Sequence, residues 1–145
     1  MRKWKSMWYV IGLLITGVLQ VIYAESDADG VLGTWYTEKC QARFEFYRIG
    51  DEYCARIHPL EKPEMLDENN PVDSLKNRKL KGNTTIFGLR YEEKETRWKG
   101  GKVYNPENGK TYGCVCRLKN GKLHFRGFLG VSLLGGSQVW TRECE

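Results

Sequence analysis

The stretch "TYGCVCRLKNGKLHFRGF", Thr111 to Phe128, contains two runs in which apolar and polar residues alternate. Alternation with a period of two is typical of a strand that buries one of its faces. Asn120 and Gly121 stand between the two runs, and both residue types tolerate the positive φ angles that a type I′ turn requires. The segment therefore predicts an antiparallel β-hairpin.

Strand-like runs of the same kind lie on both sides of this hairpin, and turn residues separate them. Residues 61–82 interrupt the pattern, because they are polar, contain two prolines and predict a long loop with room for one helical turn. So many short runs in one domain predict an all-β fold, a small antiparallel up-and-down β-barrel of about eight to nine strands. The candidate strands are residues 31–38, 42–49, 52–60, 84–92, 96–101, 101–105, 111–118, 122–130 and 137–143.

The N-terminal segment has the layout of a secretory signal peptide. Residues 1–5 include three basic side chains, residues 6–24 carry no charge, and Ala24 precedes a polar segment. We expect cleavage after Ala24, which leaves residues 25–145 as a single β-barrel domain that is exported, periplasmic or secreted, without stable membrane insertion. The alternative is a retained membrane anchor, because the uncharged stretch approaches the ~20 residues that span a bilayer.

The charge of the expected mature domain is nearly balanced. The leader holds three of the 23 basic residues of the chain, so 20 remain against 18 acidic residues. A nucleic-acid-binding domain needs a basic face or a strongly basic composition. The composition therefore argues against a nucleic-acid partner.

All five cysteines follow the leader, in the part of the chain that would reach a compartment where disulfides persist. The odd number leaves at least one cysteine unpaired within the chain, and the connectivity stays open. In a strand, the Cα atoms of Cys114 and Cys116 would lie ~6.7 Å apart with parallel side chains, a poor geometry for a mutual bond. We expect these two to be buried or to form separate disulfides. The five are Cys40, Cys54, Cys114, Cys116 and Cys144.

Gly109-Lys110-Thr111 ends like the phosphate-binding loop G-x-x-x-x-G-K-[ST] of nucleotide hydrolases. That loop has a glycine five residues earlier, where this chain has Tyr104, and Pro106 lacks a backbone N–H group for the phosphate cradle. A strand-like run, and not a helix, follows Thr111. The sequence therefore predicts a turn here and no nucleotide partner.

We predict no metal site and no cofactor. The segment "DENNPVD", residues 67–73, offers oxygen ligands, but Pro71 and Val72 occupy the next ligand position and the glycine position of an EF-hand loop. An Asx-rich turn explains the segment better. His58 and His124 fall on the polar faces of their runs, so we expect both at the surface.

A catalytic constellation is not visible either. The chain lacks the G-x-S-x-G and H-E-x-x-H motifs, and no base accompanies a candidate nucleophile. Catalysis would need a clustered acid–base pair, for which the carboxylates near aromatic faces are Glu45, Asp51 and Glu52. We therefore expect a protein that is not an enzyme.

Aromatic residues occur in nearly every candidate strand. Ordinary core packing is one explanation, and a partly open barrel that accepts an apolar or aromatic ligand is the other. We predict a ligand site inside the barrel for a small hydrophobic or amphipathic molecule, with Arg126 as a polar anchor near the mouth. The inward-facing walls would be Phe44, Phe46, Tyr53, Tyr112 and Phe125.

The two ends of the domain resemble lipocalins and related calycin barrels. Gly33-Thr34-Trp35 matches the G-x-W of their first strand, and Arg142 in "VWTR" matches the arginine of their last strand. In such barrels the arginine packs over the tryptophan, where cation–π attraction and hydrogen bonds to backbone carbonyls close the barrel floor. The resemblance implies that Trp35 and Arg142 are structural closure residues.

A closer resemblance covers most of the domain. It rests on the order and spacing of five motifs, "GTWYT", "DENNP", "WKGGKVYNPENGKTY", "RGFLG" and "GGSQVWTR". Together they resemble a bacterial family of exported domains, domain of unknown function 2147. Its members look like lipocalin-type barrels and have no established reaction, so the resemblance implies fold and export rather than a function.

We therefore expect an exported lipocalin-like binding protein. The alternative is an envelope module with a packed barrel core, whose loops, chiefly residues 61–79, bind a protein or a glycan. An interior cavity would favour the first hypothesis, and a core without a cavity would favour the second. The ligand and the oligomeric state stay open at this point.

Overall fold

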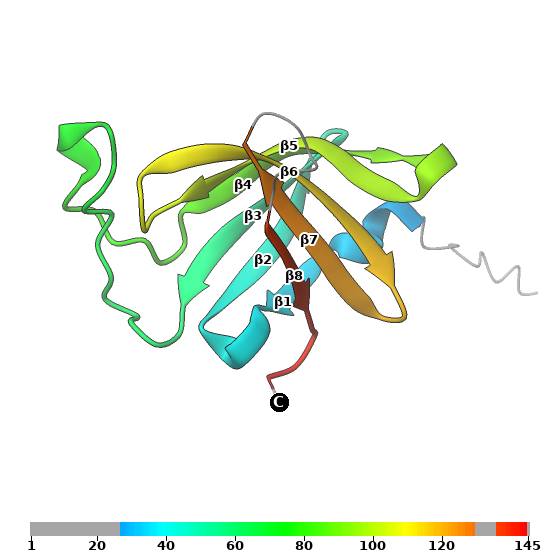
Figure 1. Ribbon diagram of the computed structural model, residues 1–145, viewed down its shortest axis with the longest axis horizontal. Helices are drawn as coiled ribbons and strands as arrows, with labels where there is room; N and C mark the ends of the chain where they lie inside the picture. Colours follow the sequence, from blue (N-terminus) through cyan, green and yellow to red (C-terminus); the bar gives the residue numbers. More distant parts are fainter. Residues whose placement is uncertain (1–26, 130–135, 145) are drawn as a thin grey trace, which may run out of the picture.

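The computed structural model describes residues 27–129 and 136–144 (Figure 1). They form one sheet of eight strands, in which each strand is antiparallel to its neighbours in sequence. A bridge between Tyr36 and Thr141 joins the first strand to the end of the last, so the sheet curls into a nearly closed barrel. The predicted up-and-down barrel is confirmed. Its strands are β1 (Gly33–Tyr36), β2 (Ala42–Ile49), β3 (Glu52–Pro59), β4 (Thr84–Glu92), β5 (Arg97–Asn105), β6 (Lys110–Lys119), β7 (Lys122–Phe128) and β8 (Gly136–Trp140).

The β6–β7 hairpin forms as predicted. Lys119 pairs with Lys122 across the turn, and the two residues between them have positive φ angles, 52° at Asn120 and 72° at Gly121. Both angles lie in the left-handed region that a type I′ turn uses. The sequence signal and the backbone geometry therefore agree residue by residue.

Residues 96–101 and 101–105, which the sequence predicts as two strands, belong to one continuous strand, β5. Gly100 has a φ of 72°, and the register against β6 shifts between Trp98 and Gly101, so the Gly-Gly pair forms a β-bulge instead of a turn. Gly101 also lacks room for a side chain, because a Cβ atom there would lie 2.5 Å from Leu89. The barrel thus has eight strands, at the lower end of the predicted number.

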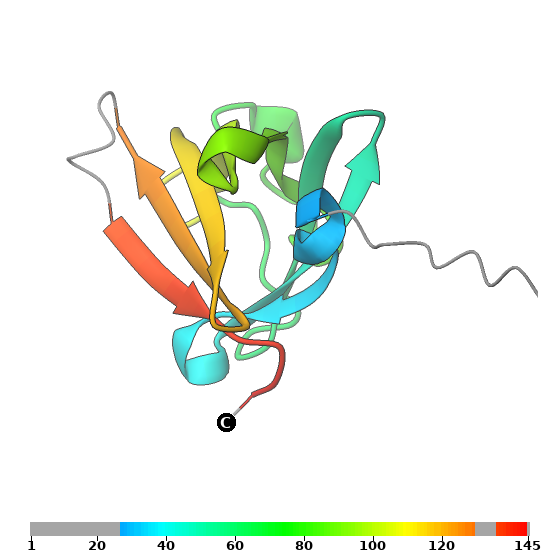
Figure 2. The same ribbon diagram turned by 90° about the vertical axis from the view of Figure 1, so that its right-hand side faces the viewer.

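Short 3₁₀ helices occupy several connections between the strands. One of them, η3, lies in the long loop between β3 and β4, where the sequence left room for a helical turn. Another, η1, lies across the end of the barrel that faces the viewer in Figure 2, and the strands surround a central interior behind it. Those in the described residues are η1 (Asp27–Val31), η2 (Glu38–Cys40), η3 (Asp73–Leu75) and η4 (Glu93–Glu95).

Three buried aromatic side chains attach η1 to the barrel, and each donates one hydrogen bond to it. Their rings fill this end of the interior together with apolar residues of the core cluster. Burial and the hydrogen bond to Asp29 raise the pKa of Tyr53 to about 12. The donors and acceptors are Trp35 Nε1 and Val31 O (2.8 Å), Trp98 Nε1 and Ala28 O (3.0 Å), and Tyr53 Oη and Asp29 Oδ1 (2.8 Å).

Arg142 lies over Trp35 at the same end of the barrel. The guanidinium carbon is 3.7 Å from the centroid of the indole ring. Its nitrogens donate hydrogen bonds to the carbonyl groups of Gly30, Leu32 and Thr34 over 2.9–3.1 Å. One side chain from the end of the chain therefore contacts both η1 and β1.

Cys40 and Cys144 form a disulfide, which ties η2 to the segment after β8. Cys54, Cys114 and Cys116 are free and buried, so burial is the outcome observed for the pair in β6. Burial raises the pKa of Cys114 to about 12 and the pKa of Cys116 well above its ordinary value. Both of these thiols therefore stay protonated at neutral pH.

The expected leader, residues 1–24, lies outside the described residues. Within residues 27–129 and 136–144, none of the helices is long and apolar enough to span a bilayer.

Candidate ligand-binding site

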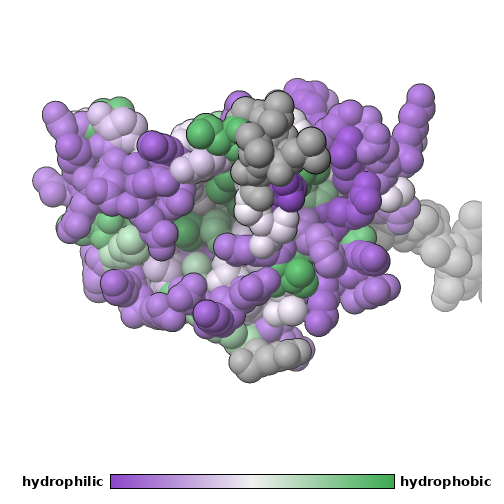
Figure 3. Space-filling view, in the orientation of Figure 1, coloured by the Kyte–Doolittle hydropathy of each residue, from purple (hydrophilic) through white to green (hydrophobic). Residues whose placement is uncertain are grey.

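The end of the barrel away from η1 holds a cavity of about 540 Å³. Its walls come from strands β2, β3 and β5–β8 and from the loop after β3. Figure 3 shows a recess with apolar surface inside a rim of hydrophilic residues. Small-molecule sites have volumes of roughly 300–1,000 Å³, so this cavity has the size of a ligand site. Its apolar lining includes Phe44, Ile57, Met65, Val103, Tyr112 and Phe125.

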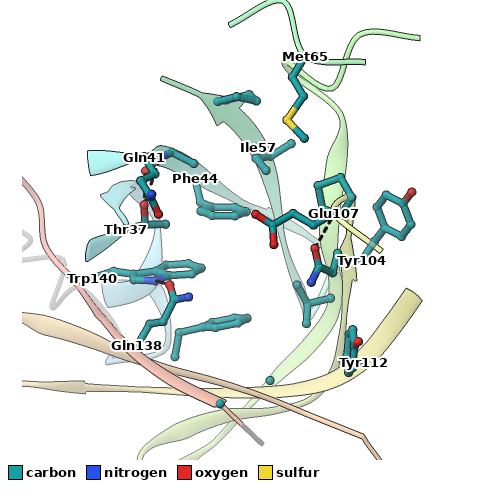
Figure 4. A pocket seen from close by; sticks show the side chains of 18 of the residues that line it. Thr37, Gln41, Phe44, Ile57, Met65, Tyr104, Glu107, Tyr112, Gln138 and Trp140 are labelled. Atoms are coloured by element: carbon teal, nitrogen blue, oxygen red, sulfur yellow. Dashed lines mark hydrogen bonds between the residues drawn. The ribbon is translucent and has the colours of Figure 1, made fainter. Parts of the chain in front are cut away.

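Trp140 is the centre of an aromatic stack in the cavity wall. The ring of Phe44 lies 4.6 Å from the indole at an interplanar angle of 5°, and the ring of Phe125 lies 4.4 Å from it at 11°. Trp140 Nε1 donates to Gln138 Oε1 over 2.8 Å, so the polar atom of the indole is satisfied. Figure 4 shows Phe44 and Trp140 on one side of the cavity and Glu107 on the other.

The long loop between β3 and β4 is fastened to the β5–β6 hairpin beside the cavity. Asp67 in this loop is fully buried and accepts hydrogen bonds from Tyr104 (2.5 Å), Asn70 (2.8 Å) and Arg78 (2.9 and 3.0 Å). Burial acts to raise the pKa of Asp67, but these hydrogen bonds and the charge of Arg78 outweigh it and hold the pKa below its usual value. The ionised carboxylate therefore connects the loop to the hairpin.

Asn69 and the turn of the hairpin make a second contact between the same two segments. Asn69 Nδ2 donates to the carbonyl oxygens of Pro106 and Glu107 over 3.2 and 2.9 Å. Gly109 packs so closely that a Cβ atom there would lie 1.9 Å from Asn69 O, and its φ is 68°. The glycine of Gly109-Lys110-Thr111 thus serves loop packing. We call residues 67–70 and 104–109 together the mouth clasp.

Residues 33–142 match a family model described as "Uncharacterized protein conserved in bacteria (DUF2147)". The chain belongs to the DUF2147 family. It is also similar to a solved structure described as protein HP1028 from the human pathogen Helicobacter pylori, which belongs to the lipocalin family. The two chains are 25% identical, with a TM-score of 0.69 over 77% of this chain and 82% of that chain. A search of curated proteins found no match. The predicted family and the lipocalin-like fold are both confirmed.

The DUF2147 barrel brings three of the predicted ligand-site residues to the cavity. Phe44, Tyr112 and Phe125 line it, and Phe46 and Tyr53 do not. The latter two face the interior but lie in the packed core, with 3% and 2% of their surfaces exposed. Strand alternation identifies inward-facing residues, but it does not show how far along the barrel the packed core extends.

Arg126 does not line the cavity of the DUF2147 barrel, although the sequence predicts it as a polar anchor there. Its neighbours in β7, Phe125 and Gly127, both line the cavity, so the alternation of the strand directs Arg126 away from it. Its Nη1 donates to Ser137 Oγ over 3.1 Å in the adjacent strand β8. Arg126 therefore forms a cross-strand hydrogen bond with Ser137, and the structure does not place it as an anchor inside the cavity.

The carboxylates considered for catalysis lie away from the cavity, and two of them form ion pairs with Arg90. Arg90 binds Asp51 at 2.6 Å and Glu52 at 2.8 Å, and Glu45 Oε2 lies 3.4 Å from His58 Nε2. None of them lines the cavity. In the part of the chain that the structure describes, no group of three or more His, Cys, Asp or Glu side chains is placed to hold a metal ion.

His58 is the residue whose predicted exposure was wrong. Its side chain is only 14% exposed, and burial is the main cause that lowers its pKa. It pairs with Arg43 in the register of β2 against β3, and the side chains around it cover the imidazole. His124 is exposed, as expected.

The residues that build the mouth of the cavity were not predicted from the sequence. Asp67 and Glu107 both lie in segments that the sequence predicts only as turns. Tyr104 and Arg78, which bond to Asp67, are 37 and 11 residues away from it, so no local pattern connects them. The available signal was that the two segments carry the motifs "DENNP" and "WKGGKVYNPENGKTY", which lie in contact in the structure.

Proposed function

We propose that this DUF2147 domain is an exported binding protein that holds a small hydrophobic or amphipathic molecule in its barrel and does not transform it. The observation that carries the proposal is the cavity of about 540 Å³ with its stacked aromatic wall. Burial of apolar ligand surface there stabilises a complex by roughly 25 cal/mol per Å². The lipocalin-like fold supports the same function.

The alternative, an envelope module that binds partners through its loops, assumed a barrel packed throughout. The core near η1 is packed, but the other end contains the cavity. The loop of residues 61–79 is held against the hairpin by the mouth clasp, where it helps to form the rim of the cavity. The structure therefore favours the ligand-binding hypothesis over the loop-binding one.

Two observations support the export that we propose. Residues 1–24 have the pattern of a leader, and the Cys40–Cys144 disulfide suits an oxidising compartment. Intact mass spectrometry of the protein from the periplasmic fraction should show a chain that begins at Glu25. A full-length chain that stays in the cytoplasmic fraction would contradict export.

Dye binding tests the cavity function. The uncharged dye N-phenyl-1-naphthylamine should gain fluorescence on binding to the mature domain. Ala42→Phe places a ring in the lining and should weaken dye binding by about tenfold or more, because the ring occupies ligand volume. The matched control, Ser74→Phe, adds the same ring at an exposed position in η3 and should leave binding unchanged. Equal binding by Ala42→Phe and the wild type, or none by the wild type, would reject the function.

A further inference from the structure

A charged side chain projects into the cavity without a protein partner. Figure 4 shows Glu107 extending from the hairpin into the cavity, toward the ring of Phe44. Its backbone is held on both sides: the N–H donates to Asn105 Oδ1 and the carbonyl oxygen accepts from Asn69 Nδ2, both over 2.9 Å. Its carboxylate has no hydrogen bond or ion pair within residues 27–129 and 136–144. The mouth clasp thus fixes the position of Glu107 and leaves its charge available to a ligand.

Two other polar side chains of the lining, Thr37 and Gln138, already have partners in the protein. Thr37 Oγ1 donates to the carbonyl oxygen of Ala42 and accepts from its N–H, and Gln138 Oε1 accepts from the indole of Trp140. These two side chains are therefore engaged in hydrogen bonds within the protein. Of the three charged side chains in the lining, Glu107, Glu61 and Lys62, Glu107 extends toward Phe44 (Figure 4), so we expect it to contact a charged head group.

The charged side chains of the cavity lining carry a net negative charge. Its lining contains two carboxylates, Glu61 and Glu107, against the ammonium group of Lys62. The carboxylate of Glu107 points toward the ring of Phe44 (Figure 4). A cation beside Glu107 would gain from attraction to the carboxylate, whereas an anion there would be repelled by it.

We propose, building on the binding function above, that the cavity selects amphipathic ligands with a cationic nitrogen head group. Glu107 binds the head group near Phe44, and the stack of Phe44, Trp140 and Phe125 contacts the apolar body. An ammonium or amidinium group fits this arrangement, because a carboxylate forms charge-assisted hydrogen bonds or a close ion pair with it.

Calorimetric titration of the mature domain at low ionic strength tests the proposal with three probes whose chains have ten carbon atoms each. The probes are decyltrimethylammonium, decanol and decanoate, each used below its aggregation concentration. Decyltrimethylammonium should bind about tenfold more tightly than decanol, and decanoate should bind more weakly than decanol. Glu107→Gln should abolish the preference for the cation and leave decanol binding unchanged, since the substitution keeps the shape and both backbone hydrogen bonds. Glu93→Gln removes an exposed carboxylate in η4, at the other end of the barrel (Figure 1), and should keep the preference.

The outcomes separate the selectivity from the binding function. Equal affinity for the three probes would overturn the cation proposal while leaving a ligand-binding cavity. Tighter binding of decanoate, lost in Lys62→Gln, would overturn it in favour of an anionic head group. Absence of binding by all three probes and by the uncharged dye would overturn both the selectivity and the function on which it rests.

Discussion

Tyr104 Oη lies 2.5 Å from Asp67 Oδ1, and this hydrogen bond joins the loop after β3 to the β5–β6 hairpin. The acceptor is fully buried, and a buried carboxylate that loses a donor is costly because water cannot replace it. The mouth clasp is therefore organised around a buried charge whose partners come from both segments. This arrangement makes the edge of the cavity sensitive to single hydrogen bonds.

We expect Tyr104→Phe to lower the free energy of unfolding by about 2 kcal/mol, because it removes a charge-assisted hydrogen bond from Asp67. Urea denaturation followed by circular dichroism measures the change. Tyr112→Phe is the matched control: it also lies in the lining, but its hydroxyl accepts from Asn108 at an exposed site, and its effect should stay below about 0.5 kcal/mol. Equal effects of the two substitutions would contradict the importance of the buried contact.

The ionised state of Asp67 predicts a pH-dependent contribution to stability. Its pKa in the folded protein lies below the usual value, whereas the unfolded chain should have a pKa of about 4. A depressed folded pKa stabilises the protein above the unfolded pKa, and the contribution disappears as the pH falls through the folded pKa. The stability difference between the wild type and Asp67→Asn should therefore be constant between about pH 5 and 7 and shrink below about pH 4.

Denaturant titrations at a series of pH values measure this difference. Glu68→Gln, which alters an exposed carboxylate in the same loop, should differ little from the wild type at any pH. A difference for Asp67→Asn that persists unchanged into strong acid would show that its charge is not the source.

The barrel could be predicted from the sequence because its signals are local. Alternation defines strands, and Asn120-Gly121 defines a hairpin without knowledge of the rest of the chain. Alternation also identified Phe46 and Tyr53 as inward-facing, but Phe46 packs against Trp140 of β8 and Tyr53 bonds to Asp29 of η1, and both contacts come from distant parts of the chain. The depth of the cavity thus follows from a tertiary contact, and a sequence pattern with a period of two contains no information about it.

The mouth clasp could not be predicted for the same physical reason. Asp67 needs two donors that are distant in sequence: Arg78, 11 residues away in the same loop, and Tyr104, 37 residues away in β5. As a local pattern, the segment around Asp67 is indistinguishable from an exposed Asx-rich turn. Burial of its carboxylate is decided by the hairpin that covers it.

Gly109→Ala should destabilise the protein more than Gly121→Ala. Both glycines have a positive φ angle, but only Gly121 has open space for an added methyl group. Gly121 has a φ of 72°, and a methyl group added to it would have no atom within 4 Å, so Gly121→Ala measures the left-handed backbone cost, about 1 kcal/mol. At Gly109 the methyl group would also collide with Asn69 O, and we expect a total of about 3 kcal/mol. Hydrogen exchange should become faster at residues 67–70 in Gly109→Ala alone. Identical stability losses would contradict the close packing.

The thiols predict a simple labelling pattern. Cys54, Cys114 and Cys116 are buried, and the raised pKa values of the latter two reduce their thiolate fraction further. In the folded protein, iodoacetamide at mild alkaline pH should therefore label none of them rapidly. In denaturant three groups should react, and five should react after reduction of Cys40–Cys144. Rapid labelling of the folded protein would contradict the burial.

The contact between Arg142 and Trp35 provides a test of closure at the other end of the barrel. Arg142→Lys keeps the charge but loses the planar fork that reaches the carbonyls of Gly30, Leu32 and Thr34. We expect the free energy of unfolding to fall by about 2 kcal/mol, because several hydrogen bonds and the stacked contact are lost together. Arg117→Lys, which removes one exposed hydrogen bond to Glu95 O, should cost less than about 0.5 kcal/mol. If both lysine variants unfold at the same urea concentration, the fork of Arg142 does not close the barrel.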